Sequence, residues 1–165
     1  MERIKFIITL AIFIIPLTMM GQTIKVYGDP VFPSNTFDLT EAGMDYTSTV
    51  TSSSGPTVDI SHKNGWAKWG GTFNWKVYIN KADLYWNQSL EIQVRRSGDG
   101  TGGSWFNNFI SGGTNFQTVT NVPNYFFNGG AVRNDVPIEF RINNISVLIP
   151  ADSYETTIYF TIYDN

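Results

Sequence analysis

The sequence contains no cysteine and only one histidine, His62, among its 165 residues. The lack of thiols excludes disulfide bonds and thiolate metal sites, and a lone histidine nearly excludes histidine-rich metal centres and serine–histidine–aspartate triads. Stability must therefore come from the burial of apolar side chains. The chain is well supplied for this, because 12 Phe, 8 Tyr and 5 Trp each bury a large area.

Charged residues are also few. The 11 Lys and Arg and the 14 Asp and Glu residues give a net charge of −3, with no basic stripe of the kind that binds nucleic acid. Asp99 is the single carboxylate of the glycine-rich stretch 97–103, which is too few for a calcium loop, so we expect a turn there. Because no nucleophile, base and orienting group form a recognisable set, we expect neither catalysis nor a bound cofactor or metal.

One long apolar run is present, and it lies near the N-terminus. Two basic residues precede the run 6–15, Pro16 ends it, and Gly21 offers a small residue for cleavage. This order is typical of a secretory signal peptide, and the run is shorter than the roughly 20 apolar residues of a transmembrane helix. We expect residues 1–21 to be removed, with an uncleaved anchor as the alternative. Residues 22–165 would then form one domain that spans no membrane and is exported to the periplasm, the cell surface or the extracellular space.

Apolar and polar side chains alternate with a period of two in most of the remaining chain. The apolar members of the alternating runs are Ile24 and Val26; Val58 and Ile60; Phe73, Trp75, Val77 and Ile79; Leu90, Ile92 and Val94; Ile138, Phe140 and Ile142; and Ile158, Phe160 and Ile162. Clusters of Gly, Ser, Asn and Pro separate these runs, and no window of ten residues has a helical period. The pattern predicts an all-β, antiparallel β-sandwich with one face of each strand buried.

The C-terminal segment carries the clearest local signal. Tyr154 follows the turn 150–153 and precedes a strand that is rich in β-branched residues. A tyrosine corner stands at this place in immunoglobulin-like sandwiches, where the tyrosine hydroxyl binds the upstream backbone. An ordinary half-buried strand tyrosine is the alternative.

The stretch Pro150-Ala151-Asp152-Ser153-Tyr154-Glu155-Thr156-Thr157-Ile158, followed by Thr161-Ile162-Tyr163, resembles the end of spore coat protein U and pilin-like exported bacterial domains. Asp152 stands where the family prefers Gly, and the cysteines of many relatives are missing. The resemblance implies an immunoglobulin-like sandwich of the Greek-key type at the cell envelope or surface. It also implies assembly, because some relatives form fibres by donating a strand to a neighbour's sheet.

The first segment of the expected domain is a candidate donor because it is short, terminal and alternating. It consists of Thr23, Ile24, Lys25, Val26 and Tyr27. The alternative, which we favour, is a first strand that pairs within its own domain, since terminal strands are usually held in this way.

Tryptophans in glycine-rich turns suggest a second kind of site. Trp66 and Trp69 lie in the turn 65–71, Trp105 follows the stretch 97–103, and three further rings stand at 125–127. A flat indole face could stack on a sugar ring, whereas the alternative is that these rings close the ends of the sandwich.

We therefore expect a secreted or cell-surface, non-enzymatic structural or adhesion domain, in the manner of a pilin-like subunit that assembles through β-strand contacts. Its partners would be further copies of itself or other envelope and surface proteins, and not nucleic acid. The alternative function is a carbohydrate-binding module or lectin that uses the exposed tryptophans Trp66, Trp69 and Trp105.

Overall fold

The computed structural model describes residues 21–33, 48–62, 73–103, 107–150 and 152–164. In these ranges it contains eleven strands and no helix. The strands are β1 (Gln22–Tyr27), β2 (Thr49–Thr51), β3 (Thr57–His62), β4 (Asn74–Asp83), β5 (Glu91–Arg96), β6 (Thr101–Gly102), β7 (Ile110–Gly112), β8 (Gln117–Thr118), β9 (Asn124–Gly130), β10 (Arg133–Asn143) and β11 (Thr156–Asp164).

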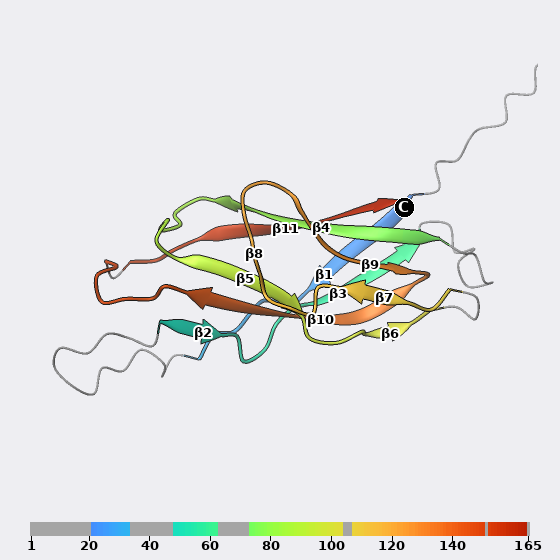
Figure 1. The fold of residues 1–165 in the computed structure, drawn as a ribbon, viewed down its shortest axis with the longest axis horizontal. Coiled ribbons are helices and arrows are strands. Elements are labelled where there is room, and N and C mark those ends of the chain that lie inside the picture. Colours follow the sequence, from blue (N-terminus) through green and yellow to red (C-terminus); the bar gives the residue numbers. More distant parts are fainter. Residues whose placement is uncertain (1–20, 34–47, 63–72, 104–106, 151, 165) are drawn as a thin grey trace, which may run out of the picture.

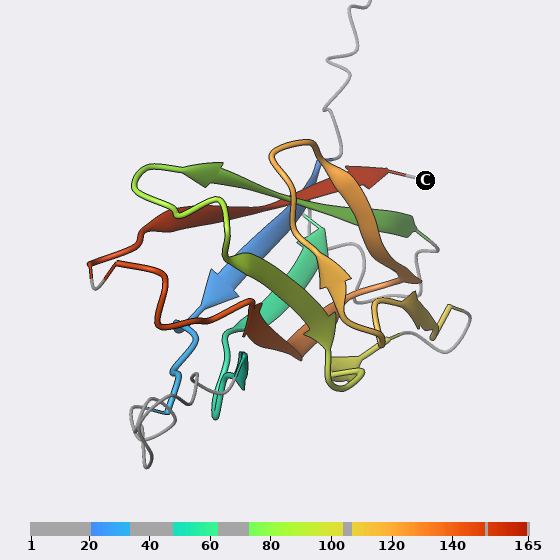
Figure 2. The same ribbon diagram turned by 60° about the vertical axis from the view of Figure 1, so that its left-hand side comes forward.

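The strands form two sheets that pack against each other (Figures 1 and 2). The seven-stranded sheet has the order β1-β3-β10-β5-β8, with β2 and β6 also paired to β10, and the four-stranded sheet has the order β11-β4-β9-β7. Every strand pair is antiparallel. The prediction of an all-β antiparallel sandwich is confirmed, while the immunoglobulin-like Greek-key assignment stays a prediction.

The alternating runs of the sequence supply the core between the sheets. In β4, Trp75, Val77 and Ile79 are fully buried, and each is separated from the next by a residue that reaches solvent. The opposite sheet contributes the buried side chains Val58, Ile60, Ile92, Val94, Val136, Ile138 and Phe140. Each inward row therefore meets apolar side chains of the other layer, as expected for two sheets with one wet face each.

Strand β9 was not predicted from the sequence. A bulge between Val77 and Tyr78 in its pairing with β4 inserts one extra residue, so that Phe126 and Phe127 are both buried in the core. Gly129, further along β9, lies against the ring of Trp75. A Cβ atom at this position would be only 2.5 Å from that ring, which explains why the residue has no side chain. Of the two alternatives for the rings 125–127, burial therefore holds for Phe126 and Phe127, whereas Tyr125 is exposed.

Candidate functional site

The edge strands of the two sheets lie side by side along one flank of the sandwich. They are β1 of the seven-stranded sheet and β11 of the four-stranded sheet. At the start of β1, Gln22 bridges the sheets, because its Nε2 donates to the carbonyl oxygen of Asn74 at 3.1 Å. The strands then diverge towards the end of β1 and the start of β11 (Figures 1 and 2). The space between the sheets is consequently open at one end of this flank.

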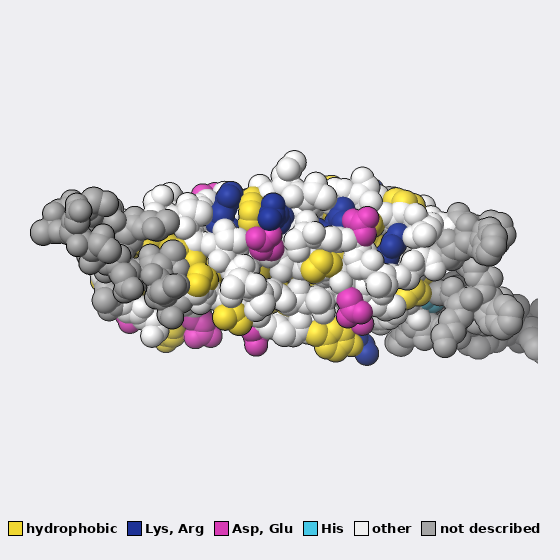
Figure 3. All heavy atoms as spheres, turned by 90° about the horizontal axis from the view of Figure 1, so that it is seen from below, with side chains coloured by type: hydrophobic (Ala, Val, Ile, Leu, Met, Phe, Trp, Pro, Cys, Tyr) yellow, Lys and Arg dark blue, Asp and Glu magenta, His cyan; other side chains and the backbone are white. Residues whose placement is uncertain are grey.

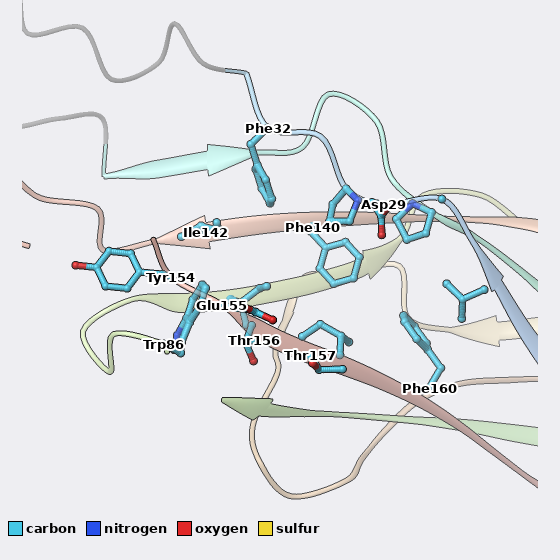
Figure 4. A pocket seen from close by; sticks show the side chains of 16 residues that line it. Asp29, Phe32, Trp86, Phe140, Ile142, Tyr154, Glu155, Thr156, Thr157 and Phe160 are labelled. Carbon is cyan, nitrogen blue, oxygen red and sulfur yellow. The ribbon is translucent and has the colours of Figure 1, made fainter. Parts of the chain in front are cut away.

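A groove of about 550 Å³ occupies this opening (Figure 4). Phe140 of β10 and Phe32, which follows β1, project into it from one side, and Phe160 of β11 from the other. Its remaining lining is Val26, Gly28, Asp29, Pro30, Pro56, Trp86, Ile92, Ile142, Tyr154, Glu155, Thr156, Thr157 and Ile158. The groove thus has an apolar floor and polar groups at its rim.

Side chains of the interior are incompletely covered along this groove. Ile158 and Phe160 lie on the inward face of β11 and pack on the core, yet they are only half-buried. Val26 of β1 is 44 % exposed. Their counterparts in β4, such as Val77, are fully buried. The sequence pattern of β1 and β11 is that of core strands, but this part of the core lacks a cover.

Both walls of the groove also have an unpaired backbone edge. In the ranges that the structure describes, β1 pairs only with β3 and β11 pairs only with β4. A strand edge of this kind presents a row of N–H and C=O groups that can pair with another strand. The groove therefore combines the two features that a β-strand needs for binding, which are a hydrogen-bonding edge and space for alternate side chains.

An ion pair within β4 lies at the open end, and Thr156 of β11 binds its carboxylate. The Lys81 Nζ donates to both carboxylate oxygens of Asp83, at 2.7 and 2.6 Å, and the two side chains are only 10 % and 12 % exposed. The Thr156 hydroxyl donates to the same carboxylate at 2.8 Å. Burial acts to raise the pKa of Asp83, but the hydrogen bonds from Lys81, Thr156 and Gln88 outweigh it and lower that pKa. The ionised carboxylate therefore holds β4 and β11 together beside the groove.

The outer face of the seven-stranded sheet carries charges that satisfy one another. Arg95 binds Glu139 at 2.6 Å, and the guanidinium groups of Arg95 and Arg141 lie 4.6 and 4.0 Å from the ring centre of Phe116. Basic and acidic side chains lie next to one another on the side of the molecule shown in Figure 3. This mixed surface offers no field of one sign to a charged partner.

The structure brings two of the predicted features to the groove. The Tyr154 hydroxyl donates to the carbonyl oxygen of Pro150, four residues upstream, and the ring lies at the end of the groove (Figure 4). The segment Gln22–Tyr27 is β1, which pairs in register with β3 from His62 to Thr57 and forms one wall. It is thus the first strand of its own domain in this structure. The role of this segment as a strand donor stays a prediction.

Other predicted features lie elsewhere or outside the described residues. Trp66, Trp69, Trp105 and the expected signal peptide up to residue 20 are outside them. Asp99 forms an ion pair with the buried Arg96, whose guanidinium also donates to the carbonyl oxygens of Gly98 and Gly112. The stretch 97–103 is therefore held by an internal arginine. In the part of the chain that the structure describes, no group of three potential metal ligands occurs.

The groove could not be predicted from the sequence, because its two walls come from opposite ends of the domain. The described residues also include no helix that is long and apolar enough to cross a membrane. Comparison with models of protein families, with curated proteins and with solved structures finds no match to this chain.

Proposed function

We propose that this domain is an exported, non-enzymatic structural or adhesion subunit that assembles with further copies of itself through β-strand contacts. The observation that carries the proposal is the groove between β1 and β11, where half-buried core side chains lie between two unpaired sheet edges. The signal-peptide pattern at 1–21 and the pilin-like segment after Pro150 agree with it.

In the proposed assembly, a strand of a second copy lies along the groove. Its backbone pairs with β1 or β11, and every second side chain enters the space over Phe140 and Phe160. Each Å² of apolar surface removed from water contributes about 25 cal/mol, so covering the half-buried side chains favours the complex. The unpaired edge gains hydrogen-bond partners in the same step.

The identity of the donated strand is a separate question. The candidate segment Thr23–Tyr27 already pairs with β3 of its own chain in the structure. It is not a free tail, so its donation requires that two copies exchange this strand. Such an exchange resembles domain swapping, in which identical elements change places between protomers. In such a swap, β1 of one copy would pair with β3 of the other.

A thiol-based block of the groove tests the proposal directly, since the natural chain has no cysteine. Val26→Cys places the only thiol of the protein on the groove wall, and Lys25→Cys places it on the neighbouring exposed position. Because side chains alternate along a strand, the second thiol points to the opposite face of β1. Both folded variants are then labelled with a bulky maleimide, which avoids any effect on folding.

Size-exclusion chromatography with light scattering measures the result over a range of protein concentrations. We expect the unlabelled proteins and labelled Lys25→Cys to form multimers, and labelled Val26→Cys to remain monomeric. A wild-type protein that is monomeric at every concentration contradicts self-assembly. Multimers that survive the label at Val26→Cys place the contact elsewhere.

A further inference from the structure

A second hollow lies at the open end of the sandwich and adjoins the groove, because Trp86 and Tyr154 line both. It encloses about 540 Å³ and is lined by Tyr85, Trp86, Asn87, Asp152, Ser153 and Tyr154, which we call the end cleft. The connection between β4 and β5 forms one wall and the segment 152–154 forms the other. Backbone hydrogen bonds join the walls, because Tyr85 and Glu155 exchange N–H to carbonyl bonds at 3.0 and 3.3 Å.

The aromatic walls of the end cleft are held in place by their own polar atoms. The Trp86 indole nitrogen donates to the carbonyl oxygen of Leu90 at 3.0 Å, and the Lys81 ammonium lies 5.5 Å from the ring centre. The Tyr154 hydroxyl is engaged by Pro150. Tyr85, in contrast, is 68 % exposed. The cleft therefore presents one open ring beside two rings of fixed orientation.

The polar side of the end cleft consists of hydrogen-bonding groups without a cation. The Asn87 side-chain oxygen accepts from the Ser89 N–H at 2.9 Å, and one Asp152 oxygen accepts from the Ser153 N–H at 2.7 Å. These bonds orient both groups but use only part of their capacity, because a carboxylate accepts several hydrogen bonds and an amide also donates two. The six lining residues include no Lys, Arg or His.

We propose that the end cleft binds a neutral saccharide chain. The apolar face of a pyranose stacks on Tyr85 and Trp86, while its hydroxyl groups donate to Asp152 and bind the amide of Asn87. A cavity of several hundred Å³ with aromatic walls and a few oriented polar groups is typical of small-ligand sites. This site adjoins the strand groove, with which it shares Trp86 and Tyr154, and it is separate from Trp66, Trp69 and Trp105 in the sequence.

Two observations favour a saccharide over other ligands. Proline-rich peptides also bind aromatic grooves, but such a peptide has carbonyl acceptors that need ring donors. Here two of the three lining rings, Trp86 and Tyr154, already donate within the chain, which leaves the Tyr85 hydroxyl for this role. An anionic ligand would meet the carboxylate of Asp152 without a lining cation to offset it. A hydroxyl-rich, uncharged ligand matches the acceptors that remain.

Calorimetric titration of the exported chain, residues 22–165, tests the assignment. The probes are soluble neutral oligosaccharides of glucose, xylose, mannose and N-acetylglucosamine, with a proline-rich decapeptide for comparison. We expect at least one saccharide to bind and Tyr85→Ala to weaken it by about tenfold or more, which corresponds to about 1.4 kcal/mol. The isosteric Asp152→Asn should weaken it as well, while Tyr85→Phe should retain most of the affinity.

The matched control is Tyr159→Ala, which removes another exposed tyrosine, from the outward face of β11. It should bind as wild type. Absence of saccharide binding by the wild type, or affinities that Tyr85→Ala and Asp152→Asn leave unchanged, would overturn the proposal. Equal losses in Tyr159→Ala, or binding of the decapeptide alone, would overturn it too. Unfolding temperatures of all variants separate lost contacts from lost structure.

Discussion

The two ends of the β1–β11 flank differ in how the core is closed. At the end near Gln22, Trp75 is completely buried, its indole nitrogen donates to the Ala131 carbonyl oxygen at 2.8 Å, and its ring meets Phe127 edge-on at 5.7 Å. At the other end, Phe160 and Trp86 are only half-buried around the groove. We call these the closed end and the open end.

The comparison shows that the same alternating sequence pattern produces both ends. In β4 the inward apolar positions Trp75, Val77 and Ile79 are buried, whereas the inward apolar side chains of the edge strand β11 are only half-buried. The cover depends on the distance between the two sheets, and at the closed end Gln22 of β1 links them through its hydrogen bond to Asn74 of β4. An open end retains apolar surface that a binding partner can cover, and this is the physical basis of the proposed assembly.

The largest effect is expected for removal of the ring at the closed end. Trp75→Ala deletes a fully buried side chain and its hydrogen bond, and it should lower the free energy of unfolding by about 3–5 kcal/mol. Trp86→Ala is the counterpart at the open end and should cost clearly less, since that ring is half-buried. Urea denaturation measures both. Equal losses would mean that the two ends are closed alike.

The next effect concerns the ion pair beside the groove. Asp83→Asn removes the negative partner of the buried Lys81, and the loss of a charge-assisted hydrogen bond should cost about 1.5–3 kcal/mol. Thr156→Val, which removes only the hydroxyl donor to the same carboxylate, should cost less. If Asp83→Asn denatures at the wild-type urea concentration, the pair does not hold the open end together.

Glycine substitutions should separate the two ends by mechanism. At the closed end, a Cβ on Gly129 would approach the Trp75 ring to 2.5 Å, so Gly129→Ala should cost about 1–3 kcal/mol through overpacking. At the open end, the nearest atom to a Cβ on Gly28 is 3.9 Å away, but its φ of +79° is unfavourable for other residues. Gly28→Asn tolerates such an angle better than Gly28→Ala, whereas Gly129→Asn should be worse than Gly129→Ala. If Ala is tolerated better than Asn at position 28, or Asn better than Ala at position 129, the two glycines do not differ in mechanism as described.

A smaller effect is expected from acid. The pKa of Asp83 is lowered in the folded protein, so the unfolded chain binds a proton more readily. The stabilisation is therefore fully present above the pKa of the unfolded chain and is lost as the pH falls through the folded pKa. The hydrogen bonds from Thr118, Gln93 and Asn143 lower the pKa of Glu91 in the same way. Stability measured between pH 6 and pH 2 should fall less steeply in Asp83→Asn than in wild type, and parallel curves would exclude this contribution.

The sequence allowed the main strands and the layer type to be predicted, because period-two alternation is a direct consequence of strand geometry. It failed for β9, where adjacent phenylalanines at a bulge and two glycines look like an aromatic loop and a turn. It also ended the β4 pattern at Ile79, although Lys81 and Asp83 continue the inward row as an ion pair. The groove depends on the spacing of two strands from distant parts of the chain, and the alternation within each strand contains no information about that spacing.

The end cleft did leave a signal in the sequence. Tyr85 and Trp86 stand together before Asn87 and directly after a strand, which is where aromatic residues at a sandwich end become accessible. Their neighbours across the cleft, Asp152 and Ser153, belong to the segment that was interpreted only as a turn before Tyr154. The loops 85–87 and 152–154 lie next to each other because β11 pairs with β4, and this strand order could not be predicted from the sequence.

Amide hydrogen exchange, measured at low and at high protein concentration, tests whether a strand of a second copy adds to the groove between β1 and β11. We expect assembly to slow the exchange of amides in β11 or β1, which each pair on one side only in the described structure. The edge strands at the far side of the two sheets, β7 and β8, should be unchanged. Protection that appears at β7 or β8, or at no strand while multimers form, would contradict it.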